Sequence, residues 1–251
     1  MSAGGSLYVG AVPSDGEGWF AAAFGPDGFA EAGAHEGIGA CWTHYEETAA
    51  RILVGAPIGS VGADGSPREC DELARAVLGD RGHVVVDPPV REAARKRRYP
   101  AAARVHERVT GRELAERAFE LADAATALDD LLREVPEARD VVAESHPEVC
   151  FTAFAGEPPA HARSTAGGYA ERMRALAEFD RDAPPAVQSA AEAAGDARVT
   201  VHDVLDALAL AYTARPGPAE LRSLPPDPPT DAEGLPMAIH YRAETPLIGG
   251  D

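Results

Sequence analysis

The chain has 251 residues and is 45% hydrophobic, enough for one large core with an elaboration, so we expect a single domain over residues 1–251. No run of about 18 apolar residues and no basic, hydrophobic leader is present, which predicts a cytoplasmic protein with no membrane partner. The formal net charge is −18, and Cys41, Cys70 and Cys150 lie far apart outside any CxxC pattern, which argues against a disulfide framework or zinc site and predicts buried free thiols.

The first third of the chain is typical of β-strands. Leu7–Val12 and Trp19–Phe24 are apolar runs separated by the turn-rich segment PSDGEG, and Gly37–Trp42 is a candidate third strand. Thr43 and Glu46 have the spacing of a capping box, so a helix is expected there. Ile52–Ile58 is then a buried strand that leads into a glycine-rich loop. That loop, GSVGADG, lacks the Lys-Ser/Thr of a phosphate-binding loop.

The middle of the chain is predicted to be helical. Helices dominate between Ser66 and about Glu137, apart from the short apolar run Val84–Val86, which predicts a helical insertion over residues 60–138. Further capping-box spacings mark helix starts at Ser66, Thr110, Ser145 and Thr200.

The last part of the chain contains the remaining core elements. Asp140–Ala143 is expected to be a buried strand, followed by a helix from Ser145. Shorter helices are expected over Tyr169–Phe179 and Pro185–Ala194. Residues 216–251 are predicted to form a proline-rich connection and a final strand at 236–241, because proline excludes helix from 216 to 230.

The segment TVHDVLDALALAYTA, residues 200–214, is an apolar helix that carries two carboxylates on one face. Asp203 and Asp206 are three residues apart, while Val201, Leu205, Leu208 and Tyr212 are expected to pack inward. Buried carboxylates are costly unless a metal, a cation or a hydrogen-bond donor meets them. Asp203 is equally explained as the capping partner of Thr200, whereas Asp206 has no such explanation and is the better candidate ligand.

Glu144 and its neighbours form a second acidic candidate. Glu144 ends the buried strand and could converge with Asp206 on one end of the sheet, although a solvated strand end is the alternative. Mg²⁺ prefers oxygen ligands, and phosphodiester cleavage with two metals requires clustered carboxylates. His146 could shuttle protons near neutral pH, or be an ordinary first-turn residue. Glu148 is explained most simply as the capping partner of Ser145.

Two groups of basic residues could contact phosphate. Arg68, Asp71 and Arg75 share a helix face, either as a self-contained salt bridge or with the two arginines gripping a phosphate. The run from Arg91 to Arg98 is either a phosphate-contacting patch or a solvated helix face.

The charge pattern suggests a salty environment. Only Lys96 among the 23 basic residues is a lysine, which favours a halophilic origin; the competing interpretation is an acidic protein that avoids nucleic acid. At about 1 M salt the Debye length is about 3 Å, so the net charge does not exclude a nucleic-acid substrate.

Seven segments resemble, in order and over nearly the whole chain, domain-of-unknown-function family 429. They are VGAPIG, RECDELARAVLGDRG, TGRELAERAFELADAATALDD, VVAESHPEVCF, STAGGYAERM, VHDVLDALALAYTA and DAEGLPMAIHY. Members of that family are described as predicted nucleases of the RNase H fold, and the last core helix is similar to that of RuvC-type resolvases. The resemblance implies an α/β fold with a mixed sheet, in which an RNase H-like core carries the helical insertion.

The family pattern falls on Arg68, Asp71, Arg75, Glu144, His146, Pro147, Glu148, Asp203 and Asp206. Relatives carry two further acids that this chain lacks. Where their first strand ends in GVDG, this chain has Val12 and Pro13, with Asp15 as a substitute through a shifted turn. Where they read DIPIG, Gly55 replaces the carboxylate.

Two functions are therefore compared. The first is a Mg²⁺- or Mn²⁺-dependent nuclease or phosphodiesterase that acts on nucleic acid or a nucleotide phosphodiester, through an apparently degenerate acidic site. Its expected parts are the primary ligands Glu144 and Asp206, the auxiliary ligands Asp203 and Asp15, the proton carrier His146, and the phosphate-binding pair Arg68 and Arg75. The second is a non-catalytic binding or regulatory module on the same fold.

Overall fold

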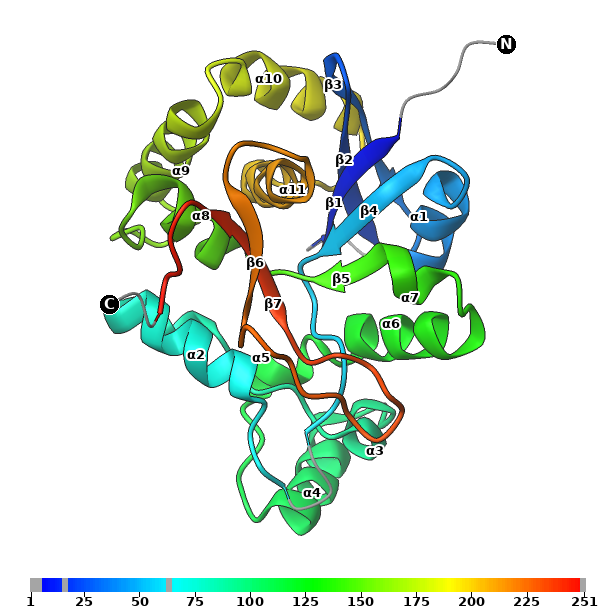
Figure 1. Ribbon diagram of the computed structural model, residues 1–251. Coiled ribbons are helices and arrows are strands. Elements are labelled where there is room, and N and C mark those ends of the chain that lie inside the picture. The colour runs from blue at the N-terminus through cyan, green and yellow to red at the C-terminus, as the bar shows by residue number, and fades with distance from the viewer. Residues whose placement is uncertain (1–5, 15–17, 62–64, 249–251) are drawn as a thin grey trace.

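A five-stranded mixed sheet forms the centre of the protein, in the order β3-β2-β1-β4-β5 (Figure 1). The computed structural model describes residues 6–14, 18–61 and 65–248. β1, β2 and β3 are antiparallel neighbours, whereas β4 and β5 run parallel to β1. The predicted α/β class is therefore confirmed. The strands are β1 Leu7–Pro13, β2 Trp19–Gly25, β3 Gly28–His35, β4 Ala49–Val54 and β5 Val142–Glu144.

Helices cover both faces of the sheet, and each face has its own core. One face packs on α1 and α6, the other on α8 to α11. Alternation along β1 explains the division, because Val9 and Ala11 belong to the first core and Val12 to the second. The helices are α1 Ile38–Tyr45, α6 Ala122–Glu134, α7 Ala138–Val141, α8 Pro147–Ala155, α9 Ala166–Phe179, α10 Ala183–Ala194 and α11 Val201–Ala214.

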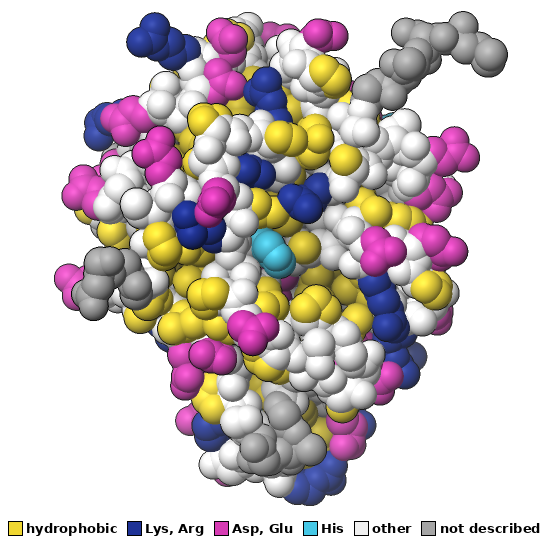
Figure 2. All heavy atoms as spheres, viewed as in Figure 1, with side chains coloured by type: hydrophobic (Ala, Val, Ile, Leu, Met, Phe, Trp, Pro, Cys, Tyr) yellow, Lys and Arg dark blue, Asp and Glu magenta, His cyan; other side chains and the backbone are white. Residues whose placement is uncertain are grey.

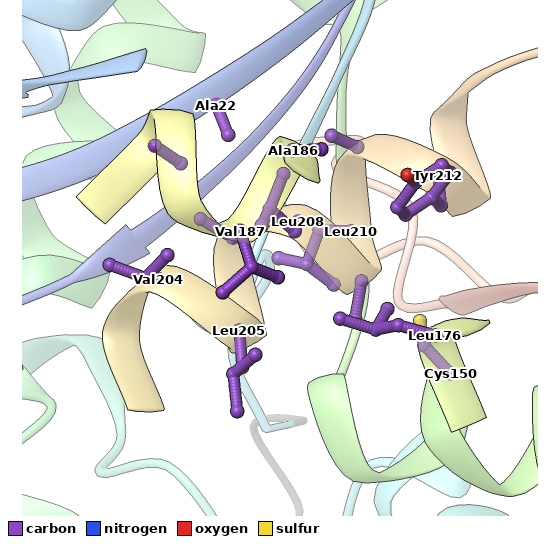
Figure 3. Packing of buried hydrophobic residues seen from close by; sticks show 14 of the residues in the cluster. Ala22, Cys150, Leu176, Ala186, Val187, Val204, Leu205, Leu208, Leu210 and Tyr212 are labelled. Carbon is purple, nitrogen blue, oxygen red and sulfur yellow. The ribbon is translucent and has the colours of Figure 1, made fainter. Parts of the chain in front are cut away.

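Helix α11 is the most deeply buried helix of its face. Every residue from Asp203 to Ala214 is buried, because α11 lies between the sheet and α8 to α10; Figure 3 shows Leu205, Leu208 and Tyr212 among their neighbours. Val201, expected to pack inward, lies in the first turn and is 51% exposed. Gly10 permits the crossing of α11 over β1, since a Cβ there would lie 2.1 Å from the Ala207 carbonyl oxygen.

The expected third strand was placed wrongly. Residues 37–42 begin α1, whose buried residues Ile38, Cys41, Trp42 and Tyr45 follow the helical spacing i, i+3, i+4, i+7. The third strand is β3, which lies directly before this segment in the chain, pairs with β2 and forms the edge of the sheet. The order of three strands, a helix and a fourth strand is nevertheless the order expected from the sequence.

Capping-box spacing located one helix start correctly and missed others. The box of Thr200 and Asp203 is present at α11. Thr43, in contrast, lies inside α1, and Thr110 ends α4. Arg68 rather than Ser66 is the N-cap residue of α2. The capping-box pattern tests only two residues, three positions apart. Where a helix starts also depends on which residues form its buried face.

The segment between β4 and α6 forms a mainly helical lobe beside the sheet. It has a small core of its own, which includes Val61, Val90 and Leu114. The expected apolar run at 84–86 follows a 3₁₀ helix and forms no strand. The lobe contains α2 Glu69–Leu78, η1 Gly79–Val84, α3 Arg91–Ala94, α4 Tyr99–Thr110 and α5 Glu116–Phe119.

The C-terminal segment forms a separate two-stranded sheet. β6, Glu220–Leu224, pairs with β7, Ile239–Ala243, so the proline-rich connection contains a strand that was not expected. A bridge from Ser145 to His240 joins this hairpin to the end of β5. The hairpin and α2 share a third core cluster.

The three cysteines are buried free thiols, as predicted. Within the described ranges, no helix combines the length and the apolar character needed to cross a bilayer.

Candidate active site

A cleft of about 730 Å³ opens at the carboxyl ends of the three parallel strands. Val12 and Pro13 end β1, Gly55 follows β4, and Glu144 ends β5. This edge of an open α/β sheet is where such folds usually bind ligands. The remaining walls come from α11, from the loop before α9 and from the lobe between β4 and α6. Their side chains include Asp203, Asp206, Glu148, Arg163, Arg81, His83, Arg117, Glu120 and Leu121.

Asp206 faces this cleft with one oxygen unsatisfied. The residue is 3% exposed, and its Oδ2 accepts a hydrogen bond of 3.0 Å from the Arg163 guanidinium. Oδ1 is buried and has no hydrogen-bond donor among the described residues. Burial raises the pKa of Asp206 to about 7, against the effect of Arg163, and the charge of Glu148 adds to the increase. A cation that reached Oδ1 would therefore find an acceptor without a partner.

Glu148 is a second carboxylate of this kind. It lies in the first turn of α8, is 6% exposed, and forms an ion pair through Oε1 with the fully buried Arg172 of α9. Its Oε2 is buried and lacks a hydrogen-bond partner in the described part of the chain. The spacing from Ser145 favoured a capping role for Glu148. In the structure the N-cap residue of α8 is His146, and the Glu148 backbone N–H donates to its Nδ1, so the carboxylate is not used for capping.

Asp203 is occupied by helix capping. Its Oδ2 accepts from the Thr200 backbone N–H at 2.9 Å and from the Ser14 hydroxyl at 3.3 Å. The side chain lines the cleft, but these donors already satisfy that oxygen. Of the two roles that the sequence left open, the structure therefore shows the cap.

Glu144 reaches the cleft but is held by a buried arginine. Arg68 Nη2 lies 2.6 Å from Oε1 and 2.7 Å from Oε2, and the Ile58 backbone N–H donates to Oε2 at 2.7 Å. Burial raises the pKa of Glu144 and outweighs the opposing effect of Arg68. Both oxygens thus have donors, in contrast to the free oxygens of Asp206 and Glu148.

The expected phosphate grip of Arg68 and Arg75 is not formed. Arg68 is fully buried between Glu144 and Asp71, with its Nε 3.3 Å from Asp71 Oδ2. Arg75 turns to Asp87 and to the Val85 carbonyl. The interpretation as a self-contained salt bridge is therefore right for Arg68 and Asp71. Neither guanidinium lines the cleft.

His146 lines the cleft as a neutral ring. Burial, together with the charge of Arg163, lowers its pKa to about 4. Its Nδ1 accepts the Glu148 N–H at 3.2 Å, which leaves the proton on Nε2. In the free protein His146 is therefore neutral near pH 7. Of the two roles that the sequence left open, a proton carrier or an ordinary residue at the helix start, the structure shows a residue that caps α8.

Val12 and Gly55 are neighbours at the bottom of the cleft. The Gly55 backbone N–H donates to the Ala11 carbonyl at 2.8 Å, and a Cβ at Gly55 would lie 2.9 Å from Val12 Cγ1. The Val12 side chain thus fills the space that a side chain at position 55 would take. Asp15, the expected substitute ligand, lies outside the described residues. Among the described residues, no three His, Cys, Asp or Glu side chains come together as a metal-binding group.

The basic run at 91–98 is largely engaged within the protein. Arg91 pairs with Asp129 and Asp231, and Arg95 pairs with Asp129 and Asp130. These contacts fasten α3 to α6 and to the loop before β7, so the arginines concerned are not available as a phosphate-contacting patch.

One known family model matches most of the chain. A sequence model described as "Protein of unknown function (DUF429)" matches residues 14–230. The chain belongs to the DUF429 family. The match begins immediately after Pro13, so the end of β1, where this DUF429 protein lacks the expected acid, precedes it. Neither the curated proteins nor the solved structures contain a match to the chain.

Sequence reasoning missed the arginines that surround the carboxylates of this DUF429 chain. Arg172 was detectable, because it lies on the same helix face as the buried Gly168, Ala175 and Leu176. An arginine on an apolar face needs a buried acceptor, and it finds Glu148. Arg163 lies in a loop, where no periodicity predicts the direction of a side chain.

Proposed function

We propose that this cleft hydrolyses phosphodiesters with the help of one bound Mg²⁺ or Mn²⁺. The observation that carries the proposal is the pair of buried carboxylate oxygens, Asp206 Oδ1 and Glu148 Oε2, that lack donors within the described chain. Leaving a buried acceptor unsatisfied is costly, and a cation removes that cost. The expected RNase H-like core is consistent with the mixed sheet and is part of the same proposal.

Two carboxylates are enough for such a cation. Mg²⁺ usually keeps several waters and is held by one or two carboxylates together with substrate phosphate oxygens. Asp206 and Glu148 fit that donor set, and Asp203 supports it by fixing the start of α11. Glu144 was the expected primary ligand, but its oxygens are taken by Arg68 and Ile58, so we assign it a structural role at the floor of the cleft.

We infer one cation rather than two. A two-metal site needs further carboxylates between the ions, and the strand ends that would supply them carry Val12 and Gly55. When bound, the ion would polarise the phosphoryl oxygens. The reaction adds water across a P–O bond and gives a phosphomonoester and an alcohol. Arg163, 47% exposed and paired with Asp206, is positioned to exchange that carboxylate for a substrate phosphate oxygen.

The test combines metal binding with turnover. Mn²⁺ binding is measured by isothermal titration calorimetry at about 1 M KCl, where surface charge is screened, and turnover is measured with bis(p-nitrophenyl) phosphate. We expect the parent protein to bind Mn²⁺ and to release p-nitrophenol only when Mn²⁺ is present. Asp206→Asn and Glu148→Gln should each weaken binding and reduce turnover toward the rate of Mn²⁺ in buffer.

Matched controls come from exposed acids outside the cleft. Asp227→Asn and Glu157→Gln make the same chemical changes at exposed positions that do not line the cleft, and they should behave as the parent. Failure of the parent to bind Mn²⁺ would refute the metal site and favour the non-catalytic binding module. Binding without turnover of the phosphodiester would refute the proposed reaction alone.

A further inference from the structure

The wall of the cleft that comes from the lobe between β4 and α6 is basic, in contrast to the acidic floor. Arg81 and His83 of η1 and Arg117 of α5 line it. Arg117 donates a hydrogen bond to the His83 carbonyl, which holds its guanidinium against the element that carries Arg81. Two arginines from separate elements, joined by this hydrogen bond, therefore line the cleft together with Glu120.

Arg81 differs from the other two arginines that line the cleft. Arg163 is paired with Asp206, and Arg117 with a carbonyl oxygen. Arg81 has no hydrogen-bond or ion-pair partner within the described chain, and its Nε is shielded from solvent. In a chain with 41 acidic and 23 basic residues, an unpaired half-buried guanidinium is unexpected. Two oxygens of a phosphate group would satisfy its donors in a bidentate contact.

We propose that Arg81 and Arg117 form an anion subsite for a terminal phosphate of the substrate. The substrate is then a small molecule that carries two phosphate groups, one a phosphodiester at the carboxylates and the other a phosphomonoester at Arg81. A 5′-phosphorylated dinucleotide has this chemistry. The assignment of the scissile group rests on the proposed phosphodiesterase function, whereas the anion subsite stands on the arginines alone.

The dimensions of the cleft favour a small substrate over a nucleic-acid polymer. Its volume of about 730 Å³ lies within the range of small-molecule sites. A polymer needs a track of Lys and Arg beyond the site. In the basic run at 91–98, Arg91 and Arg95 are tied to acids, and the exposed Arg97 and Arg98 are too few for such a track. On the face shown in Figure 2, Lys and Arg side chains form separate groups, with Asp and Glu side chains beside them and around the edge.

Part of the cleft lining is apolar. Val84 and Val86, which follow Arg81 in the chain, contribute to it together with Leu121 and Ile239. These side chains offer a surface for the organic part of the ligand, such as a base or a sugar face. The cleft thus combines basic, apolar and carboxylate side chains in its lining, which are the groups that a ligand with two phosphates and an organic moiety would need.

Binding without metal tests the subsite independently of catalysis. The probes are a 5′-phosphorylated thymidine dinucleotide, the same dinucleotide without the 5′-phosphate, and a long DNA duplex, each titrated calorimetrically in EDTA. We expect the 5′-phosphate to improve affinity about ten-fold, as two charge-assisted hydrogen bonds allow. Arg81→Gln should remove this preference. Arg104→Gln, at an exposed position of the same lobe outside the cleft, should keep it.

The outcomes separate this proposal from the proposed function. Equal affinity for the two dinucleotides, or an undiminished preference in Arg81→Gln, would overturn the subsite even if Mn²⁺-dependent turnover is found. Tighter binding of the duplex than of the phosphorylated dinucleotide would overturn the small-substrate assignment. A preference that depends on Arg81 would support the subsite even if the protein proves unable to bind Mn²⁺.

Discussion

Replacing Asp206 by asparagine is expected to stabilise the metal-free protein above neutral pH. The carboxyl has an ordinary pKa of 3.8 in the unfolded chain and a pKa of about 7 in the folded one, where burial favours the neutral form. Between these values the folded state holds a proton that the unfolded state has lost. The free energy of unfolding therefore falls as the pH rises from about 4 to about 7, and stays low above that range.

The magnitude follows from the two pKa values. One pKa unit corresponds to about 1.4 kcal/mol, so the difference between 3.8 and about 7 gives an upper limit of about 4 kcal/mol. Relaxation and water penetration reduce such penalties, and we expect about 2 kcal/mol in practice. Asparagine resembles the protonated acid at every pH. Arg163 loses its partner in this variant, but its side chain is 47% exposed and remains solvated.

Urea unfolding in EDTA measures the effect, with the free energies of parent and variant compared at about pH 4 and about pH 8. The difference should be small at the lower pH and should favour Asp206→Asn at the higher. Asp227→Asn, at an exposed acid, should show no such dependence. An Asp206→Asn variant that is equally stable relative to the parent at both pH values would refute the reasoning. Added Mn²⁺ should reverse the order at about pH 8, because only the parent gains the ligand.

Three further predictions concern packing and pairing. Gly10→Ala should destabilise the protein by about 3 kcal/mol or more in urea unfolding, because its Cβ would overlap the backbone of α11, whereas Gly33→Ala on the edge strand meets open space and should be nearly neutral. Arg172→Met should lower the free energy of unfolding by about 3–5 kcal/mol, because it leaves Glu148 buried and unpaired. Adding Glu148→Gln should recover part of that loss. Equal stability of the single and double variants would contradict this prediction. Arg163→Ala should tighten Mn²⁺ binding in calorimetry, because it removes a competing cation from the cleft, and unchanged or weaker affinity would show that Arg163 does not compete.

Local signals predicted a large part of the fold. The apolar runs of β1 and β2 and the capped, apolar segment of α11 are recognisable because the information lies within about ten consecutive residues. Residues 37–42 were misread as a strand, since a short apolar run is ambiguous until its buried residues are known. β6 was missed because the prolines around it hide a short strand.

The candidate site was predicted in its acids but not in their partners. Asp206 was identified because a carboxylate on an apolar helix needs an explanation, and Glu144 because it ends a buried strand; Glu148 was interpreted as a capping residue, although the family pattern also includes it. Which carboxylate keeps a free oxygen depends on Arg68 and Arg172, which approach from elsewhere in the chain. Such pairings over long sequence distances depend on tertiary geometry, and no spacing rule in a single sequence reports them.

The contact between Val12 and Gly55 couples the side chains that these two positions can accept. Because Val12 Cγ1 lies 2.9 Å from where a Cβ at position 55 would be, any acid introduced there first meets the valine. Replacing Val12 by alanine relieves this contact, so Gly55→Asp is expected to be better tolerated in a Val12→Ala background than in the parent protein. Positions 12 and 55 are therefore sterically coupled. The stability of a Gly55→Asp variant alone would underestimate how well the protein accepts a carboxylate at position 55.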